Sequence, residues 1–435
     1  MLDIEYIREN KEAVKKNCRL RNIKCDVGRL LELDEKRRKL IGEIGEIKEK
    51  RNELNEEMKK VKDKKDLIEK GKELKENLEK LKPELEKVEK EWKTILWKVP
   101  NVISDDTPIG KDESGNKVIR KWGEIPKFDF QPKEHGQLGE ELDIIDIPRA
   151  AKVSGSRFNF LKNEAALLEF ALIQHAFSIL TNEDTLKGVI KEVGLDVSAK
   201  SFIPVVPPVL IKPGPMERMA RLEPREERYY APADDLYLIG SAEHTLGAMY
   251  MDEIIKEEDL PMRFIGFSTA FRREAGSYGK DTKGILRVHQ FDKLEMESFC
   301  LPENSIEEQN FIVAIQEYLM QSLRLSYQVV AICTGDLGGP DYRQIDIETW
   351  LPGQNRYRET HTSDLMNDYQ SRRLNTKVRK KNGKLEYVHM NDATAFAIGR
   401  TIIAIIENYQ QADGSVVIPE VLRKWMPGNL EKIEK

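Results

Sequence analysis

FRREAGSYGKDTKGILRVHQFDKLE, residues 271–295, places arginines, carboxylates and aromatic residues on two apolar-flanked runs. Both flanks alternate apolar and polar residues, whereas AGSYGKDTKG between them has the composition of a turn, so the segment predicts an antiparallel hairpin with a long tip. The side chains expected on its neighbouring strands are Arg272, Glu274, Arg287, Phe291 and Glu295. Arginines suit phosphate oxygens and an aromatic ring suits a nucleobase, so the hairpin predicts a nucleotide site. A surface hairpin laced with salt bridges is the alternative from these residues alone.

The composition is that of a large globular protein. The chain has 435 residues, of which 40% are hydrophobic and 34% charged, and its formal net charge is -5. This length suggests two or three domains, and the charge confines any RNA contact to local basic patches, with no DNA partner expected. No run approaches the roughly 18 apolar residues of a membrane span, so we expect no membrane association and a cytoplasmic protein.

Four cysteines are scattered along the chain, namely Cys18, Cys25, Cys300 and Cys333. They lack short paired spacings, so they predict neither a disulfide framework nor a CxxC zinc site. We expect them to be reduced and structural, and we expect no zinc.

Residues 27–99 are rich in Glu, Lys, Leu and Arg and carry two heptad seams with alternating steps of four and three residues. KKVKDKKD, residues 59–66, separates the seams, so we expect an antiparallel two-helix coiled coil whose first helix reaches on the order of 40 Å. Pro83 is unfavourable inside a helix and predicts a kink in the second one. The seams are Leu33, Arg37, Leu40, Ile44, Ile47, Arg51, Leu54, Met58 and Val61, then Leu67, Gly71, Leu74, Leu78, Leu81, Leu85, Val88, Trp92 and Ile95.

The far end of this arm is basic. The tip lysines are Lys59, Lys60, Lys62, Lys64 and Lys65. A charge run is most often a solvated helix face. Because these lysines gather at the end of a long arm, they predict contact with an RNA backbone through release of counterions.

The rest of the chain reads as a separate body. A Pro-, Gly- and Asp-rich linker follows Trp97, and from about Phe130 apolar helical stretches alternate with short strand-like runs. Neither a GxGxxG pattern nor a P-loop is present, so the sequence favours an α+β fold with an antiparallel sheet backed by helices over a doubly wound fold.

The hairpin resembles the second signature of class II aminoacyl-tRNA synthetases, because F-R-x-E opens it at Phe271 and R-x-x-x-F closes it at Phe291. AGSYGKDTKGILRVHQFDKLE is similar to seryl-tRNA synthetases in particular, and the resemblance covers essentially the whole chain. NEAALLEFALIQHAFSIL with SFIPVVPPVLI resembles the first signature, which implies a dimer interface at Pro208. From residues alone, Pro207 and Pro208 would mark an edge strand. HMNDATAFAIGRTIIAIIENYQQADGSVVIPEVLR resembles the third signature, with Gly399 and Arg400 entering a helix at Thr401.

This resemblance implies a fold and an activity. Residues 106–435 would form the class II catalytic domain, and residues 1–105 a tRNA-binding domain with the coiled-coil arm. The enzyme would be a cytoplasmic homodimer that activates L-serine with ATP to seryl-adenylate and pyrophosphate. It would then transfer serine to the 3′ end of tRNA(Ser) and, where one exists, tRNA(Sec). Magnesium would accompany ATP.

The resemblance also implies roles for individual residues, and its catalytic arginines are Arg272 and Arg400. Serine would be bound by Ser241, Glu243, Arg272, Glu295, Asp392 and Thr394. ATP would be bound by Arg272, Glu274, Arg287, Phe291, Glu359, Thr362 and Arg400. Glu359 and Thr362 would hold the metal, which suits the oxygen ligands that Mg²⁺ prefers. The tip lysines would bind tRNA, and the loop from Ala275 to Gly284 would meet its end.

Several positions depart from the family pattern. Asp392, Ala393 and Thr394 stand where it has Asn-Gly-Ser, and Ser241 stands where it has Thr. His361, Thr362, Ser363 and Asp364 stand where it has Ser-Ser-Cys-Ser. Asp392 adds a negative charge near the position of the serine carboxylate. Two alternatives remain: a paralogue that loads a carrier protein or is inactive, and a coiled-coil scaffold or RNA-binding protein without activity.

Overall fold

The computed structural model describes residues 1–275 and 284–435. Two compact units make up the chain, residues Met1–Val102 and Ile103–Lys435. Within the described ranges no single helix is long and apolar enough to cross a membrane. One pair of helices, Asn163–Leu180 and Glu183–Val193, meets the length and composition of a membrane span when taken together, and the two are bent by 74° relative to each other.

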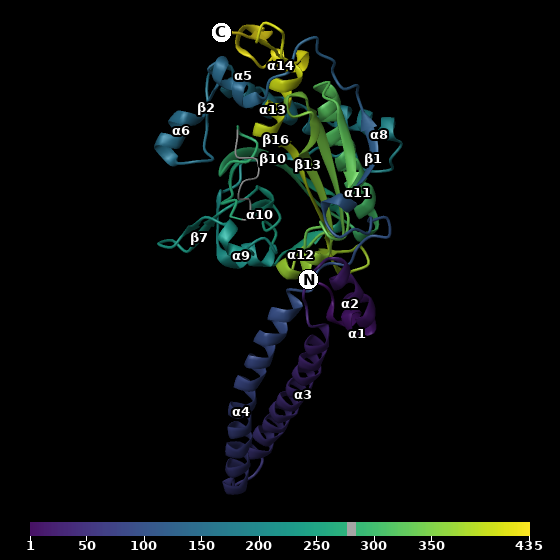
Figure 1. The fold of residues 1–435 in the computed structure, drawn as a ribbon. Helices are drawn as coiled ribbons and strands as arrows, with labels where there is room; N and C mark the ends of the chain where they lie inside the picture. The colour runs from purple at the N-terminus through teal and green to yellow at the C-terminus, as the bar shows by residue number, and fades with distance from the viewer. Residues whose placement is uncertain (276–283) are drawn as a thin grey trace. The chain divides into compact units, whose positions relative to one another are not determined.

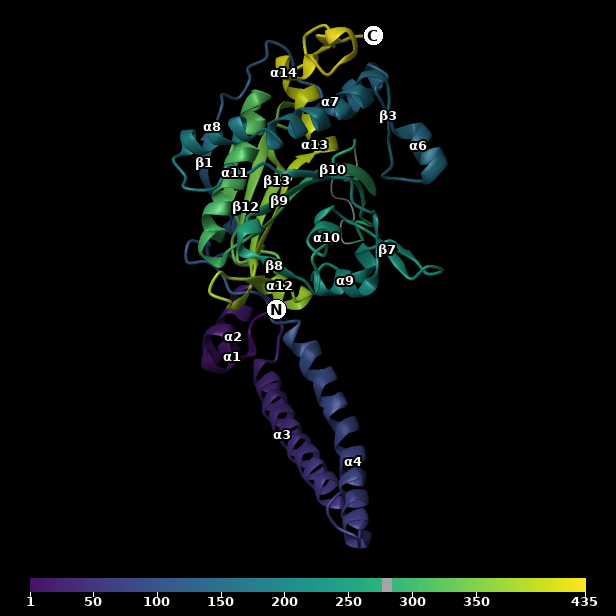
Figure 2. The same cartoon turned by 180° about the vertical axis from the view of Figure 1, so that it is seen from behind.

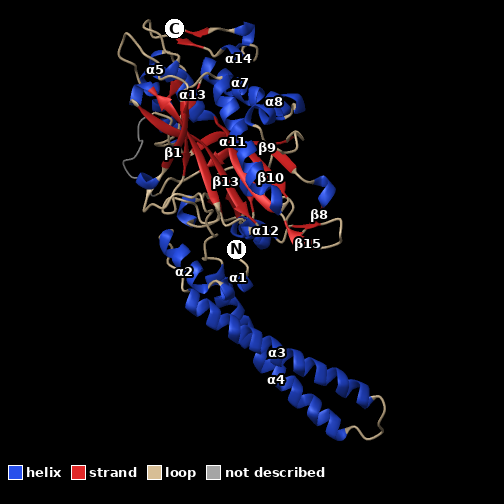
Figure 3. Cartoon of the chain, turned by 90° about the vertical axis from the view of Figure 1, so that its right-hand side faces the viewer, coloured by secondary structure: helices blue, strands red, loops and turns tan. Residues whose placement is uncertain are grey.

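The first unit is entirely helical. Its helices are α1 (Ile4–Glu9), α2 (Lys11–Leu20), α3 (Val27–Met58) and α4 (Lys65–Leu96). Asp26 caps α3 by accepting a hydrogen bond from the N–H of Arg29 at 2.9 Å. α3 and α4 lie antiparallel, joined by a short turn (Figure 3). The predicted two-helix coiled coil is therefore confirmed.

Leucines of the seam pack between the two long helices. Leu33, Leu40 and Val88 are buried there. Arg37, the charged member of the seam, stacks over Trp92 at 4.7 Å and pairs with Glu89 at 3.1 Å, which explains why an arginine occupies an inward position.

One detail of the arm differs from expectation. The seam ends at Met58, because the helix stops there and Val61 lies exposed in the turn. α4 continues through Pro83 as one helix, and the kink expected there stays a prediction. The tip lysines are all exposed, and Lys59 pairs with Glu56 at 2.6 Å.

An eight-stranded sheet forms the centre of the second unit, in the order β1-β11-β12-β13-β16-β10-β9-β4 (Figures 1 and 2). Neighbours pair antiparallel except β4 and β9, which run parallel. The predicted antiparallel sheet is thus confirmed. In chain order the strands are β1 (Lys117–Trp122), β4 (Ile203–Val205), β9 (Met262–Phe271), β10 (Gln290–Cys300), β11 (Tyr327–Ala331), β12 (Arg343–Leu351), β13 (Arg356–Asn367) and β16 (His389–Ala397).

Helices cover one face of this sheet and leave the other to polar side chains. The covering helices are α7 (Asn163–Leu180), α8 (Glu183–Val193), α11 (Ser305–Ser322) and α13 (Ile398–Asn408). Leu294 and Met296 of β10 point into their core, whereas Lys293, Glu295 and Glu297 alternate with them and face the other side. The alternation gives this strand one apolar and one functional face.

Smaller elements surround the sheet. The helices are α5 (His135–Glu141), α6 (Ile147–Ser154), α9 (Pro213–Arg218), α10 (Glu243–Leu246), α12 (Tyr369–Leu374) and α14 (Glu420–Arg423). The short strands are β2 (Ile145–Asp146), β3 (Phe160–Leu161), β5 (Leu210–Ile211), β6 (Tyr230–Ala231), β7 (Leu236–Leu238), β8 (Ile254–Lys256), β14 (Lys377–Arg379), β15 (Leu385–Tyr387), β17 (Val416–Val417) and β18 (Lys432–Ile433). α9, α10 and β7 lie opposite the polar face of the sheet (Figure 2).

Buried polar contacts from α11 fix the strands beneath that polar face. Gln316 donates to the carbonyls of Thr362 and Thr394, each at 2.8 Å, and so ties β13 to β16. Arg263 of β9 forms a fully buried pair with Glu308 at 2.6 Å. Arg263 also donates to two backbone carbonyls and Glu308 also accepts from the Ser298 hydroxyl, as buried charges require.

Candidate active site

The hairpin expected around residues 271–295 is present as β9 and β10, with Phe271 opposite Gln290 and Gly266 opposite Glu295. Arg272, Glu274 and Arg287 were predicted on its strands, and this is wrong: all three lie beyond the strand ends. Arg272 N–H still bonds His289 O at 3.0 Å, but Glu274 then adopts a positive φ of 52° and turns the chain away from the sheet. Residues 276–283 of the loop expected to meet the tRNA end lie outside the described residues.

The arginines and the aromatic ring of the predicted nucleotide site converge on one cavity. Its volume is ≈ 110 Å³. Arg272 lies over the Phe291 ring at 5.3 Å and donates from Nε to Gly240 O at 3.0 Å. Arg287 Nη1 donates to Glu274 Oε2 at 2.9 Å. The predicted residues that line the cavity are Arg272, Glu274, Arg287, Phe291, Glu359, Thr362, Thr394 and Arg400.

Arg400 enters the cavity from the first turn of α13, which begins at Ile398 and not at Thr401 as expected. Its Nη1 donates to both Oε1 and the backbone carbonyl of Glu359, each at 2.9 Å. At Gly399, the nearest atom to an added Cβ is Ile285 O at 3.9 Å, an ordinary contact. No described protein atom therefore requires glycine there.

Acidic and hydroxyl side chains gather next to this cavity, on the polar face of β10 and at the start of α10. Lys293 Nζ lies 2.8 Å from Glu295 Oε2 and donates to Ser241 Oγ at 3.1 Å. Glu243 is the first residue of α10 and is buried, and no side chain caps this helix with a hydrogen bond. No role was predicted for Lys293 from the sequence, although it stands within the hairpin motif.

The two carboxyl groups that flank Lys293 and Ser241 have different pKa values. Burial raises the pKa of Glu295 to about 8, with Glu243 and Asp392 adding to the shift and Lys293 opposing it. Burial also acts to raise the pKa of Glu243, but His244, Lys293 and Arg221 outweigh it and hold that pKa below its ordinary value. Glu243 is therefore ionised and Glu295 largely protonated at neutral pH.

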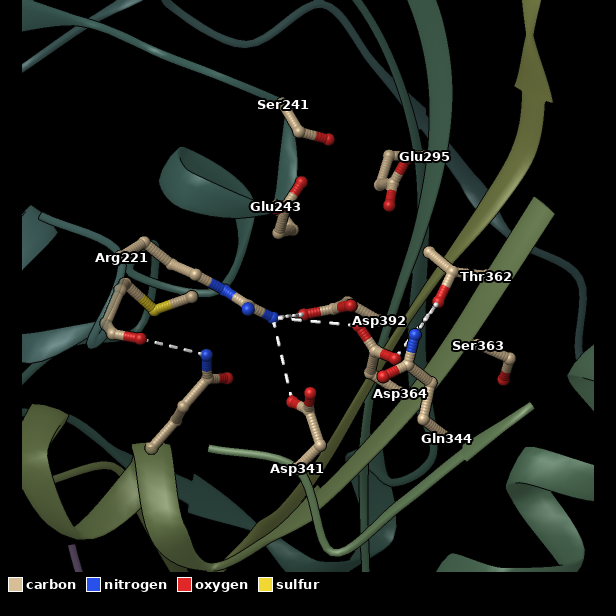
Figure 4. A network of polar contacts seen from close by, with 12 residues as sticks. Arg221, Ser241, Glu243, Glu295, Asp341, Gln344, Thr362, Ser363, Asp364 and Asp392 are labelled. Atoms are coloured by element: carbon tan, nitrogen blue, oxygen red, sulfur yellow. Dashed lines mark hydrogen bonds and ion pairs between the residues drawn. The ribbon is translucent and has the colours of Figure 1, made fainter. Parts of the chain in front are cut away.

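The position that departs from the family pattern, Asp392, is bound by an arginine for which the sequence predicted no role. Arg221 Nη2 donates to Asp392 Oδ2 at 3.0 Å, and it also lies 3.8 Å from Asp364 and 4.0 Å from Asp341 (Figure 4). Burial raises the pKa of Asp392 to about 6, with Arg221 opposing the shift. Nothing in the local sequence distinguishes Arg221 from its neighbours Arg218 and Arg225.

The other departures are also buried, except Thr362, which is partly exposed. His361 has 1% of its surface exposed, and its Nδ1 lies 2.9 Å from Thr360 Oγ1. Burial lowers the pKa of His361 to about 3, so its imidazole is neutral at neutral pH. Thr362 Oγ1 lies 3.1 Å from Asp364 Oδ1 and accepts from Gln344 Nε2 at 3.2 Å.

The residues expected to hold a metal, Glu359 and Thr362, both lie on β13. Glu359 stands directly opposite Glu348 across β13 and β12, and Thr362 stands opposite Asp346. Two carboxylates facing each other repel unless a cation lies between them, and Glu359 and Thr362 both line the cavity. These oxygen donors fit Mg²⁺. Among the described residues there is no cluster of three or more His, Cys, Asp or Glu side chains arranged for a metal.

A buried histidine links the hairpin to α13. His135 Nε2 accepts the N–H of Ile285 at 3.2 Å, so its Nδ1 carries the proton donated to Glu407 Oε1 at 2.8 Å. An added Cβ at Gly284, whose φ is 71°, would lie 1.9 Å from His135 Nε2. His135 therefore fixes the chain that leads into Arg287. The sequence did not predict this role, because His135 is a single histidine outside any motif.

Comparisons with known proteins agree along the whole chain. Residues 1–103 match the family model described as seryl-tRNA synthetase N-terminal domain, and residues 228–409 match that of the tRNA synthetase class II core domain (G, H, P, S and T). A protein of Dictyoglomus thermophilum named serine–tRNA ligase is 43% identical over 432 residues, 98% of each chain. One of Rubrobacter xylanophilus with the same name is 40% identical over 427 residues, 97% of each chain.

Solved structures show the same similarity. The crystal structure of seryl-tRNA synthetase from Pyrococcus horikoshii complexed with ATP has a TM-score of 0.87 at 38% identity, covering 100% of this chain and 99% of that one. Cytoplasmic serine-tRNA ligase from Naegleria fowleri in complex with AMP has a TM-score of 0.83 at 29% identity, with the same coverage.

Proposed function

The chain belongs to the seryl-tRNA synthetase family, and we propose that it is a serine–tRNA ligase whose two substrates meet on the polar face of the sheet. The single observation that carries this assignment is the convergence of Arg272, Phe291 and Arg400 on one cavity, beside the Ser241, Glu243 and Glu295 cluster. One region thus suits a nucleotide triphosphate and the next suits a small zwitterion.

In the first step, a serine carboxylate oxygen attacks the α-phosphorus of ATP. A bond forms between that oxygen and phosphorus, the bond to the β-phosphate oxygen breaks, and pyrophosphate leaves with the electron pair. The protein supplies position and charge and needs no nucleophile of its own. Arg272 stabilises the α-phosphate, Arg287 the terminal phosphates, and Arg400 closes the other side, while the adenine stacks on Phe291.

Glu274 accepts a hydrogen bond from the adenine amino group. Mg²⁺ held by Glu359 and Thr362 would, when bound, neutralise charge on the phosphates. Arg400 keeps the Glu359 carboxylate in place through the 2.9 Å bond.

Serine is recognised by groups of opposite character around the Lys293 side chain. Ionised Glu243 and the Ser241 hydroxyl bind the ammonium group of serine, and Glu295 accepts a hydrogen bond from the hydroxyl group of serine. Asp392 and Thr394 complete the pocket. A site built to bond a hydroxyl rejects alanine, because alanine leaves a buried polar group unpaired.

In the second step, the 3′ hydroxyl of the tRNA attacks the seryl-adenylate carbonyl and AMP leaves. The arm of α3 and α4 carries the tip lysines, which are exposed and suit a phosphate backbone. The arm therefore binds tRNA(Ser), and tRNA(Sec) where one exists, while the domain of residues 106–435 binds the acceptor end.

The enzyme works as a cytoplasmic homodimer. Apolar side chains on α7 and around β4, where the first signature lies, are exposed: Leu167, Phe170, Ile203 and Val206. Exposed apolar side chains are typical of an interface, and Pro208 lies on the same segment as Ile203 and Val206. A paralogue that loads a carrier protein is not favoured, because residues 1–103 match the N-terminal tRNA synthetase domain.

Pyrophosphate exchange with a panel of amino acids tests this function. We expect exchange with serine and ATP, and we expect Arg272→Ala to abolish it, since the guanidinium that contacts both the ring and the Gly240 carbonyl is removed. Near-normal exchange in Arg272→Ala would overturn the role of Arg272, and exchange with an amino acid other than serine would overturn the function.

A further inference from the structure

One guanidinium supports three buried carboxyl groups at the floor of the proposed serine pocket. Arg221 lies after α9, while Asp392 comes from β16, Asp364 from β13 and Asp341 from the segment before β12 (Figure 4). Asp392 and Asp341 each have 2% of their surface exposed. The nearest of the three pairs is that of Arg221 Nη2 with Asp392 Oδ2, at 3.0 Å.

The backbone around Arg221 holds this side chain in place. Its N–H donates to Met216 O at 3.1 Å, and its carbonyl accepts from Arg228 Nε at 2.9 Å. Within the described residues, Arg221 Nε is buried without a hydrogen-bond partner. The Arg221 side chain is 18% exposed and thus largely enclosed, and the nearby carboxyl groups compensate its charge.

The charges balance within the pair. Burial raises the pKa of Asp392 to about 6, so Asp392 is ionised at neutral pH, and its 3.0 Å contact with Arg221 makes the two side chains a neutral pair. A neutral unit at this position has the net charge of the side-chain amide that the family pattern carries.

We propose that Arg221 is a positioning residue for serine, which holds the ionised Asp392 carboxylate at the pocket floor so that the pair replaces a neutral amide. The inference rests on the proposed function, because it gives Asp392 a serine to contact. Arg221 itself touches Asp392 and not the substrate. Without Arg221, Asp392 would add an uncompensated charge to a pocket that already holds Glu243 and Glu295.

A double-mutant cycle tests the proposal in pyrophosphate exchange. Arg221→Met should raise KM for serine by about tenfold or more, because truncating one partner of a buried charge pair leaves the other unpaired. KM for ATP should change less than about twofold, since neither Arg221 nor Asp392 lines the nucleotide cavity. Asp392→Asn alone should also weaken serine binding, because it removes the carboxylate nearest to the guanidinium.

The double variant Arg221→Met/Asp392→Asn should lie closer to the wild type than Arg221→Met does, since both charges are gone. Arg225→Met is the matched control, because Arg225 is exposed and its ion pair with Glu223 lies at the surface. Arg221→Lys, which keeps the charge, supplies a folded variant if Arg221→Met fails to fold, and it should fall between wild type and Arg221→Met.

Additive effects in the cycle, or equal rises of KM for serine and ATP, would overturn the proposal. So would an unchanged KM for serine in Arg221→Met or in a folded Arg221→Lys. These outcomes differ from failure of the proposed function, which would appear as wild-type protein without serine-dependent exchange.

Discussion

Serine affinity should rise with pH between about 6.5 and 8.5 because of Glu295. The side chain is 1% exposed, and burial raises its pKa to about 8, with Glu243 and Asp392 adding to the shift. Lys293, 2.8 Å away, opposes it. Bound serine brings an ammonium that neutralises Glu243 and a hydroxyl that donates to Glu295, and both favour the ionised Glu295 carboxylate.

The direction of this pH dependence follows from the protons bound by each state. Below pH 8 the free enzyme holds a proton on Glu295 that the complex releases, so raising the pH favours the complex. For one group with a pKa near 8 that must be ionised, the apparent dissociation constant varies as one plus the ratio of protonated to ionised enzyme. It should therefore fall about fifteenfold between pH 6.5 and pH 8 and then level off.

Equilibrium binding of serine across this pH range measures the effect, with Glu295→Gln as the matched control. The variant keeps the size of the side chain and shares any titration of serine itself, so the ratio of the two profiles isolates Glu295. A profile for the wild type that is flat or falls with pH would show that ionised Glu295 is not required for serine binding. The same slope in Glu295→Gln would assign the titration to another group.

Three further predictions concern the nucleotide, the metal and the tRNA. His135→Ala should raise KM for ATP by about tenfold and KM for serine much less, because it removes the bonds that fix Ile285. Equal rises of the two KM values, measured by pyrophosphate exchange, would contradict this. Glu359→Gln should raise the Mg²⁺ concentration for half-maximal exchange by about tenfold or more, and an unchanged Mg²⁺ requirement would argue against a metal at Glu359. Replacing the tip lysines with alanine should weaken tRNA binding and leave serine-dependent exchange unchanged. The slope of log affinity against log salt concentration should become shallower by about one for each phosphate that is no longer neutralised. Unaltered tRNA binding would show that the arm tip does not contact the tRNA.

Local patterns in the sequence were enough to predict the arm and the hairpin. A heptad seam and alternating strands depend on residues close together in the chain, and Leu33, Leu40 and the β9–β10 pair follow them. The strand limits were less predictable. β9 ends at Phe271, so Arg272 and Glu274 lie outside the sheet, and the turn-like composition after them did not predict this limit.

The contacts that tune the site come from distant segments, and here the sequence was insufficient. Arg221 meets Asp392, 171 positions away, and His135 meets Ile285, 150 positions away. Neither residue stands in a motif whose spacing implies such a partner. Their roles depend on the packing of α9 against α10 and α12 and of α5 against β2 and α13, which only the folded chain defines.

Serine–tRNA ligase activity itself can be measured by incubating the protein with ATP, all twenty amino acids and a mixture of tRNAs, and then identifying the aminoacyl-adenosine released from the charged tRNAs. We expect seryl-adenosine alone, recovered from tRNAs with a long variable arm. Another aminoacyl-adenosine, or serine on tRNAs with short variable arms to the same extent, would contradict the proposed activity.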